Sequence, residues 1–151
     1  FDDHHFPLDT NDVVTAWVPA QPTPIEMGPL SFAYPLNVHE LVNAVTFEKT
    51  GTGYDRGVSE VFKKNGVTVN ETPFELGEVS FHHNLNFHTA SQNRTTRSRV
   101  ALANTYFRDG ARVINNPTMV SGDWQKFMPN INPGDIAASP LNPICWPVDD
   151  K

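Results

Sequence analysis

The residues that could do chemistry gather in one short segment, FHHNLNFHTASQNRTTRSR, residues 81–99. This segment holds three of the six histidines and, after them, three arginines, in a chain whose net charge is -6. An imidazole can bind a metal or line the polar face of a strand, and a guanidinium group can donate two parallel hydrogen bonds to a carboxylate. The elements that position these side chains decide which use is open to them.

Residues 77–88 alternate between apolar and polar side chains, which predicts a β-strand with two different faces. The expected apolar face carries Val79, Phe81, His83, Leu85 and Phe87. The expected polar face carries Ser80, His82, Asn84, Asn86 and His88. A polar face that meets solvent is common in antiparallel sheets and remains the alternative to a functional site.

The turn-forming run SQNRTT follows this strand and predicts a hairpin with a second strand at residues 97–107. In that register His88 and Arg99 face each other across the hairpin. Arg99 shares its face with Ala101 and Ala103, whose small side chains leave space above the sheet. The pattern favours Arg99, rather than Arg94 or Arg97, as the arginine that binds a carboxylate.

Short runs rich in β-branched residues, such as DVVTAWVP and LSFAY, end at prolines or turns and predict several short strands. VHELVNAV and YDRGVSEVFKKNG predict two short helices, the second ending at Gly66. With 13 prolines in the chain, we expect a mainly β fold, an antiparallel sandwich or jelly roll with accessory helices. We expect the core strands within residues 1–110 and an irregular but ordered tail over residues 111–151.

The acidic composition favours a small-molecule partner over nucleic acid or an anionic membrane, both of which attract basic surfaces. Cys145 is the single cysteine, so an internal disulfide is excluded and a reducing compartment fits. No run approaches the roughly 18 apolar residues of a membrane span, and the first residues lack the pattern of a signal peptide. We therefore expect a cytoplasmic protein, and the sequence does not indicate its oligomeric state.

The segment GEVSFHHNLNFHTASQNRTTRSRVAL resembles the C-terminal signature of the phytanoyl-CoA dioxygenase family. Members of this family are non-haem Fe(II)- and 2-oxoglutarate-dependent oxygenases with a double-stranded β-helix, or jelly-roll, fold. The resemblance implies that His88 is the distal iron ligand and that Arg99 binds the far carboxylate of 2-oxoglutarate. Asn93 falls on the asparagine of the signature, and Thr89 fills a position at which the family has a smaller residue.

The segment DVVTAWVPAQPTPIEMGPLSFA resembles the family's stretch in which a strand ending in tryptophan leads to a turn of the type MGPL. The resemblance implies that Trp17 lies at the 2-oxoglutarate site with Asn93 and Arg99. The family continues with glycine, serine and histidine, but this chain has YPLN at residues 34–37, so that histidine is absent. In all, the resemblance covers about residues 1–110.

The family's other two iron ligands come from a His-x-Asp motif, whose residues i and i+2 point the same way on a strand. The aspartate falls on Asp2, and the histidine falls one position before Phe1. We therefore expect this sequence to be the C-terminal part of a single longer domain, rather than a protein that has lost a ligand. Asp3 is the rival carboxylate, while His4 and His5 fit surface or supporting positions.

The resemblance implies an enzyme that uses Fe(II), 2-oxoglutarate and dioxygen to hydroxylate an unactivated C–H bond of a small organic or acyl substrate. Asp2 favours hydroxylation, because halogenating relatives have a small residue there. The first alternative is a jelly-roll module with an incomplete iron site that only binds a carboxylate ligand. The second is a cupin-like metal site of His82, His83 and His88, which is disfavoured because adjacent residues of a strand point to opposite faces.

Overall fold

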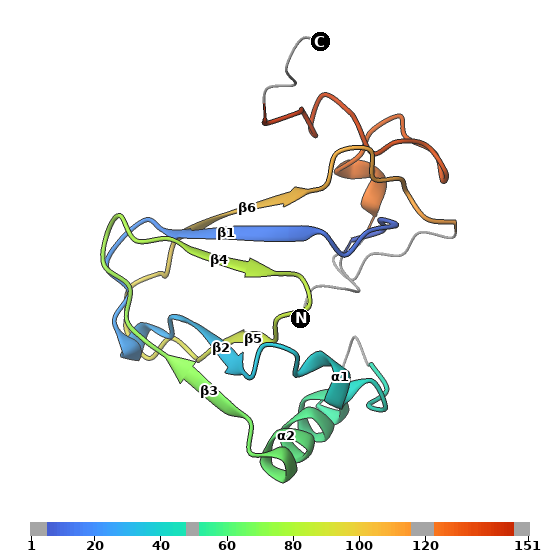
Figure 1. The fold of residues 1–151 in the computed structure, drawn as a ribbon. Coiled ribbons are helices and arrows are strands. Elements are labelled where there is room, and N and C mark those ends of the chain that lie inside the picture. Colours follow the sequence, from blue (N-terminus) through green and yellow to red (C-terminus); the bar gives the residue numbers. More distant parts are fainter. Residues whose placement is uncertain (1–5, 48–51, 116–122, 147–151) are drawn as a thin grey trace.

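The computed structural model describes residues 6–47, 52–115 and 123–146, and in them the chain forms two three-stranded antiparallel sheets (Figure 1). The first sheet has the strand order β4-β1-β6, with β1 at Val13–Pro19, β4 at Ser80–His83 and β6 at Ala101–Phe107. The second has the order β3-β2-β5, with β2 at Leu30–Tyr34, β3 at Thr68–Glu71 and β5 at His88–Ala90. The prediction of a mainly β chain with short helices is confirmed.

The two sheets lie one above the other and converge at the left of Figure 1. The chain changes sheets between β1 and β2, between β3 and β4, and at both ends of β5. Strands that are neighbours in the sequence therefore often lie in different layers. Each sheet therefore has an inner face, and the two inner faces face each other.

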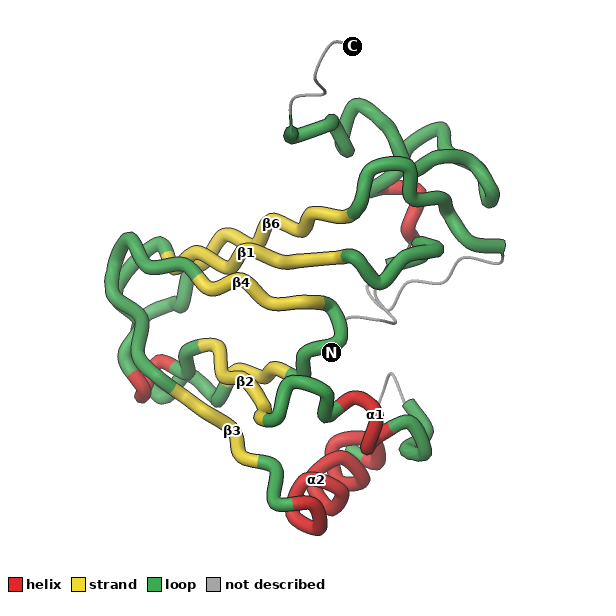
Figure 2. The backbone as a smooth tube through the Cα atoms, in the orientation of Figure 1, coloured by secondary structure: helices red, strands yellow, loops and turns green. Residues whose placement is uncertain are grey.

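Two helices, α1 at His39–Val42 and α2 at Gly53–Asn65, lie against the outer face of the second sheet (Figure 2). Their apolar residues pack with Ala33 of β2 and with Phe87 in a buried cluster. Gly66 ends α2 with a left-handed φ of 65°, and its amide donates to the carbonyl of Phe62, as the sequence predicts. In the described part of the chain, no helix is long and apolar enough to span a membrane.

A second buried cluster lies beside the first sheet, at the end where β1 begins and β6 ends. It joins Leu8 and Val13 to Val113 and to Met128 and Ala137 from the later part of the chain. Isolated β-bridges and a 3-10 turn, η2 at Trp124–Lys126, replace regular strands there. Residues 123–146 are thus anchored to the first sheet by packing.

The predicted single strand over residues 77–88 is wrong, because the chain turns sharply after β4. The amide of Asn86 donates to the carbonyl of His83 at 3.0 Å, and the amide of His83 donates to Oδ1 of Asn86 at 3.1 Å. Asparagine side chains stabilise turns through such bonds to the backbone. The turn takes the chain out of the first sheet, and the chain enters the second sheet as β5 at His88.

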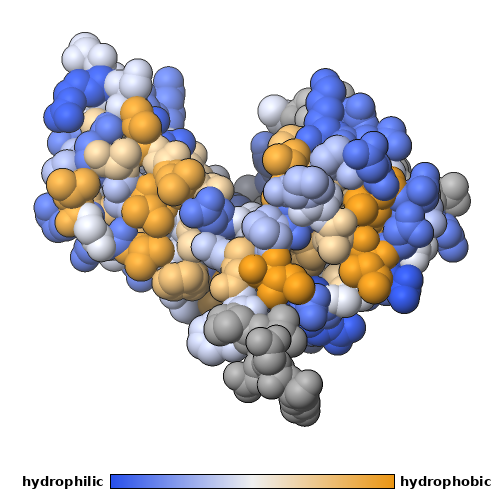
Figure 3. Space-filling model, turned by 90° about the horizontal axis from the view of Figure 1, so that it is seen from above, coloured by the Kyte–Doolittle hydropathy of each residue, from blue (hydrophilic) through white to orange (hydrophobic). Residues whose placement is uncertain are grey.

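The alternative of a polar face that meets solvent does not hold for β4. His82 is only 6% exposed, whereas Phe81 is 66% exposed. Phe81 shares the outer face of the first sheet with Leu102 and Tyr106 of β6, which are exposed as well. Figure 3 looks down on the molecule from this side and shows hydrophobic residues on its surface. The polar face of β4 therefore points at the other sheet.

Replacing Phe87 by alanine should destabilise the chain much more than the same change at Phe81. Phe87 is buried against Phe62 of α2, with ring centroids 5.5 Å apart, and removal of such a ring costs about 3–5 kcal/mol. Phe81→Ala should change stability by no more than about 0.5 kcal/mol, because the ring is exposed. Urea unfolding of both variants measures the difference, and equal losses would contradict the observed faces of β4.

Candidate functional site

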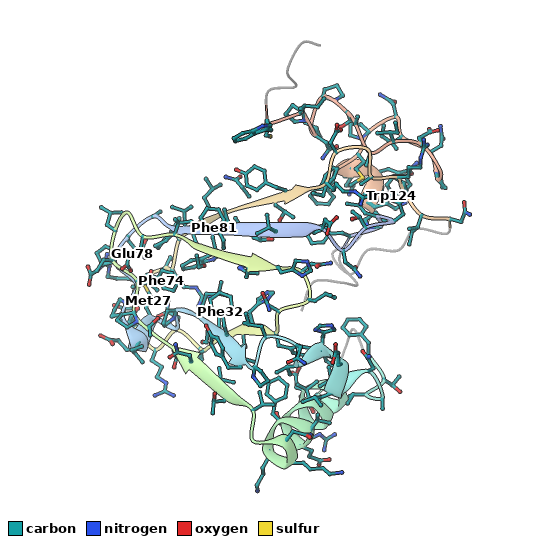
Figure 4. The ribbon with its side chains drawn as sticks, in the orientation of Figure 1. Met27, Phe32, Phe74, Glu78, Phe81 and Trp124 are labelled. Carbon is teal, nitrogen blue, oxygen red and sulfur yellow. The ribbon has the colours of Figure 1, made fainter. Side chains whose placement is uncertain are left out.

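Three rings from both sheets meet in the interior, and we call them the ring cluster: Phe32 of β2, His82 of β4 and His88 of β5. The centroids of the two imidazoles lie 4.5 Å apart. The centroid of Phe32 lies 5.4 Å from that of His82 and 6.4 Å from that of His88. Figure 4 shows Phe32 in the space between the sheets. Both histidines of the predicted polar face therefore come together, but from opposing sheets rather than from one strand.

One ring nitrogen of His88 makes a hydrogen bond to the backbone, and this bond bears on whether the other nitrogen can bind a metal. Nδ1 of His88 lies 3.0 Å from the carbonyl oxygen of Asn86. Because a carbonyl oxygen can only accept, a neutral imidazole carries its proton on Nδ1 and keeps a lone pair on Nε2. Metal-binding histidines in proteins have this same bond from the second ring nitrogen. His88 therefore fits the role of an iron ligand.

The inner face of the first sheet is polar next to the ring cluster. Thr15 lies opposite His82 on β1, and its hydroxyl lies 2.9 Å from that of Thr105. Ser80, on the same face of β4 as His82, has a buried Oγ without a hydrogen-bond partner among the described residues. Since buried hydroxyls are normally paired, Ser80 is a group that a bound molecule would satisfy.

The structure does not form the predicted hairpin between residues 77–88 and 97–107. β5 pairs with β2, and β6 pairs with β1, so the two strands lie in different sheets and His88 does not face Arg99. β6 begins at Ala101, which leaves Arg99 in the preceding loop. There Arg99 is exposed, and its Nη1 donates to the carbonyl of Gly28. The strand pattern missed this placement because turn signals do not show which strand pairs with which.

Arg99 belongs to a set of contacts that we call the loop junction, between residues 20–29 and residues 91–100. Besides the bond from Arg99, three contacts tie the two loops: Ala20 N to Val100 O at 2.9 Å, Gln21 Nε2 to Ser98 O at 2.6 Å, and Arg94 N to Glu26 O at 2.8 Å. The loop junction lies at the end of the molecule where the two sheets converge. It fixes the backbone around Arg99.

Asn93 shapes the second loop from within. Its Oδ1 accepts hydrogen bonds from the amide and the hydroxyl of Thr95, at 2.9 and 2.7 Å. Its Nδ2 donates to the carbonyl of Arg97 at 2.7 Å. These partners lie in the same loop as Asn93, so its observed role is to hold the segment that carries Arg99.

Trp17 lies on the inner face of β1, two residues beyond Thr15 and toward the loop junction. Its ring packs edge-on against Phe74, with centroids 4.9 Å apart and an angle of 63° between the planes. Ser80 is its direct neighbour on β4 and Ala103 its neighbour on β6. These residues lie on the inner face between the ring cluster and the loop junction. In the second sheet, the chain from His88 to Ser91 also runs from the ring cluster toward the loop junction. Three residues of extended chain span about 10 Å.

The carboxylate of the predicted iron site lies outside the described residues, as do Asp3, His4 and His5. Asp2 therefore stays a prediction. In the part of the chain that is described, no group of three or more His, Cys, Asp or Glu residues could hold a metal. The alternative metal site of His82, His83 and His88 is not formed with His83, because His83 is exposed on the opposite face of β4 from His82.

Comparisons with solved structures define the class of fold. No family model and no curated protein matches the sequence. The fold is shared with non-haem α-ketoglutarate-dependent enzymes from nogalamycin biosynthesis. The carbocyclase SnoK matches with a TM-score of 0.69 and 22% identity over 94% of this chain and 52% of its own. The epimerase SnoN matches with a TM-score of 0.62 and 19% identity over 91% of this chain and 50% of its own.

A further structure of SnoN, in complex with Fe3+, α-ketoglutarate and nogalamycin RO, matches with a TM-score of 0.65 and 19% identity. This match covers 94% of the present chain and 54% of SnoN. The chain thus spans about half the length of each of these solved structures. At these identities the likeness establishes the shared fold, and the chemistry is argued from this chain's own residues.

Gly28→Ala should lower the free energy of unfolding more than an alanine at a comparable glycine outside the loop junction. Gly28 has a φ of 71°, and a Cβ there would collide with the carbonyl of Ser91 and lie 3.2 Å from Nη1 of Arg99. Gly110 is the matched control, because its φ is 76° and nothing lies within 4 Å of the added carbon.

Urea unfolding of the two variants checks this prediction. Gly110→Ala should cost about 1–2 kcal/mol from the left-handed backbone alone. Gly28→Ala should cost more, since the backbone at Ser91 must also move. Equal costs in the two variants would contradict the close packing of the loop junction.

Proposed function

We propose that the chain forms part of the active site of an Fe(II)- and 2-oxoglutarate-dependent dioxygenase with a double-stranded β-helix fold. The observation that carries the proposal is the bond from Nδ1 of His88 to the carbonyl oxygen of Asn86, which is the bond that metal-binding histidines make from the ring nitrogen that does not bind the metal. The shared fold supports it, because the SnoN complex holds iron and α-ketoglutarate. The sequence signature that contains His88, Asn93 and Arg99 supports it independently.

In this proposal Nε2 of His88 binds Fe(II), and Asp2 supplies the carboxylate. The family's first histidine falls one position before Phe1, so the full-length protein is the one to test. Two histidines and one carboxylate on one face of the iron leave room for 2-oxoglutarate and dioxygen. Bound in this way, the metal and its co-substrate supply the oxidising chemistry, while the protein binds, orients and shields the substrate.

Arg99 is proposed to bind the far carboxylate of 2-oxoglutarate. A guanidinium group has five N–H donors, and the bond to Gly28 uses a donor on Nη1, so others are left for a bidentate pair with a carboxylate. Trp17 and Ser80 lie on the inner face between the ring cluster and the loop junction, where the body of the co-substrate would pass. Asn93 would act by holding the loop of Arg99 in place.

The proposed substrate is a small organic or acyl molecule, hydroxylated at an unactivated C–H bond. The SnoN complex, which contains nogalamycin RO, supports a small-molecule substrate. Hydroxylation is proposed because Asp2 keeps a carboxylate at the position that halogenating relatives leave open. Mass analysis of the products tests this choice, since incorporation of one oxygen atom distinguishes hydroxylation from ring closure or epimerisation.

Arg99→Ala should weaken the binding of 2-oxoglutarate by about 10- to 100-fold. Hydrogen bonds to a charged group contribute about 1.5–3 kcal/mol, and each 1.4 kcal/mol is about tenfold in affinity. Arg97→Ala is the matched control, because Arg97 is exposed and lies in the same loop. The affinity of this variant for 2-oxoglutarate should stay at the parent value. Calorimetric titration of the Fe(II)-loaded protein under anaerobic conditions measures both. Unchanged affinity in Arg99→Ala would remove Arg99 from the site.

Anaerobic titration of the full-length protein with Fe(II) and 2-oxoglutarate tests the function itself. The chelate should give a visible charge-transfer band, which His88→Ala should abolish. Phe81→Ala, a change at an exposed residue on the opposite face of β4 from His82, should keep it. If 2-oxoglutarate binds without iron and without the band, the chain is instead a binding module for carboxylate ligands.

A further inference from the structure

We propose that His82 is a positioning residue that holds the imidazole of His88 in its metal-binding orientation. The inference rests on the proposed function of His88 and adds a residue that the sequence signature does not assign. His82 is 6% exposed and comes from the opposing sheet. Its ring centroid lies only 4.5 Å from that of His88, with an angle of 49° between the planes, so the two rings are in contact.

The backbone around His88 gives its ring limited support. His88 is the first residue of β5, a strand of three residues that pairs on one side with β2. It directly follows the turn that carries the chain between the sheets, and its Nδ1 bond goes back to Asn86 in that turn. The side chains that pack against the His88 ring add to the orientation that this bond gives it.

His82 is placed to give that support from the opposing sheet. β4 pairs with β1 over four residues, and His82 lies opposite Thr15. β1 is the central strand of its sheet and pairs along its whole length with β6 on the other side. The hydroxyl pair of Thr15 and Thr105 lies next to His82 on the same inner face.

Phe32 completes the arrangement from the second sheet. It lies opposite His88 in the β2–β5 pair, and its ring is within 5.4 Å of His82 and 6.4 Å of His88, measured between centroids. The three rings form a triangle across the gap between the sheets. His82 thereby couples the direction of the His88 ring to the first sheet.

Two substitutions separate this role from direct metal ligation by a nitrogen atom of His82. His82→Ala removes the ring and should weaken Fe(II) binding by about 10- to 100-fold, the usual effect of losing a residue that orients a metal ligand. His82→Phe keeps a flat ring without nitrogen atoms and should restore most of the affinity. Phe81→Ala, at the exposed neighbour on β4, should leave the affinity unchanged.

The measurement is anaerobic calorimetric titration of the full-length protein with Fe(II), with urea unfolding as a check that each variant is folded. Parent-like affinity in His82→Ala would overturn the proposal. Loss of binding in His82→Phe as complete as in His88→Ala would also overturn it, because His82 would then be a ligand itself. If the unsubstituted protein binds no Fe(II), the proposed function fails, which is a different result from either.

A measurement on the unsubstituted protein keeps the test decisive even if the variants do not fold. With histidine labelled by nitrogen-15, Zn(II) can replace iron and the ring nitrogens can be followed by NMR. Nε2 of His88 should show a coordination shift, while the ring nitrogens of His82 should not. A coordination shift at His82, or none at His88, would overturn the assignment.

Discussion

The turn at residues 83–86 is the constraint on which the candidate site depends. By ending β4 and sending the chain into the other sheet, it places His82 and His88 on opposing inner faces, where their rings meet. A continuous strand would have kept both histidines in one layer, pointing the same way with their rings well apart. The same turn provides the carbonyl of Asn86, which fixes the proton of His88 on Nδ1. The change of sheet and the orientation of the proposed metal ligand thus depend on the same turn.

The loop junction is the second fixed point, and it lies at the other end of the proposed site. Its hydrogen bonds join the loop between β1 and β2 to the loop between β5 and β6, and Gly28 lets the two backbones approach closely. Arg99 is held there by the carbonyl of Gly28. Between the two ends lie Trp17 and Ser80 on the inner face of the first sheet.

Local signals in the sequence predicted local structure well. β1, β2 and the end of α2 at Gly66 follow from short β-branched runs and a glycine cap. Pairing over long distances could not be read in the same way, so the hairpin that joined His88 to Arg99 was wrong. The alternation along residues 77–88 showed that β4 has two different faces. It did not show which face points inward, and Phe81 is exposed. His82 and His88 were placed on one polar face and do meet, although the reason is the change of sheet.

In the proposed site a metal binds His88 at the ring cluster, and 2-oxoglutarate runs from there to Arg99. The most direct test is a crystal structure of the full-length protein grown anaerobically with Fe(II) and 2-oxoglutarate, with anomalous diffraction recorded at the iron edge. We expect an iron peak within bonding distance of Nε2 of His88 and a carboxylate paired with Arg99. An iron peak elsewhere, or 2-oxoglutarate bound away from Arg99, would contradict it.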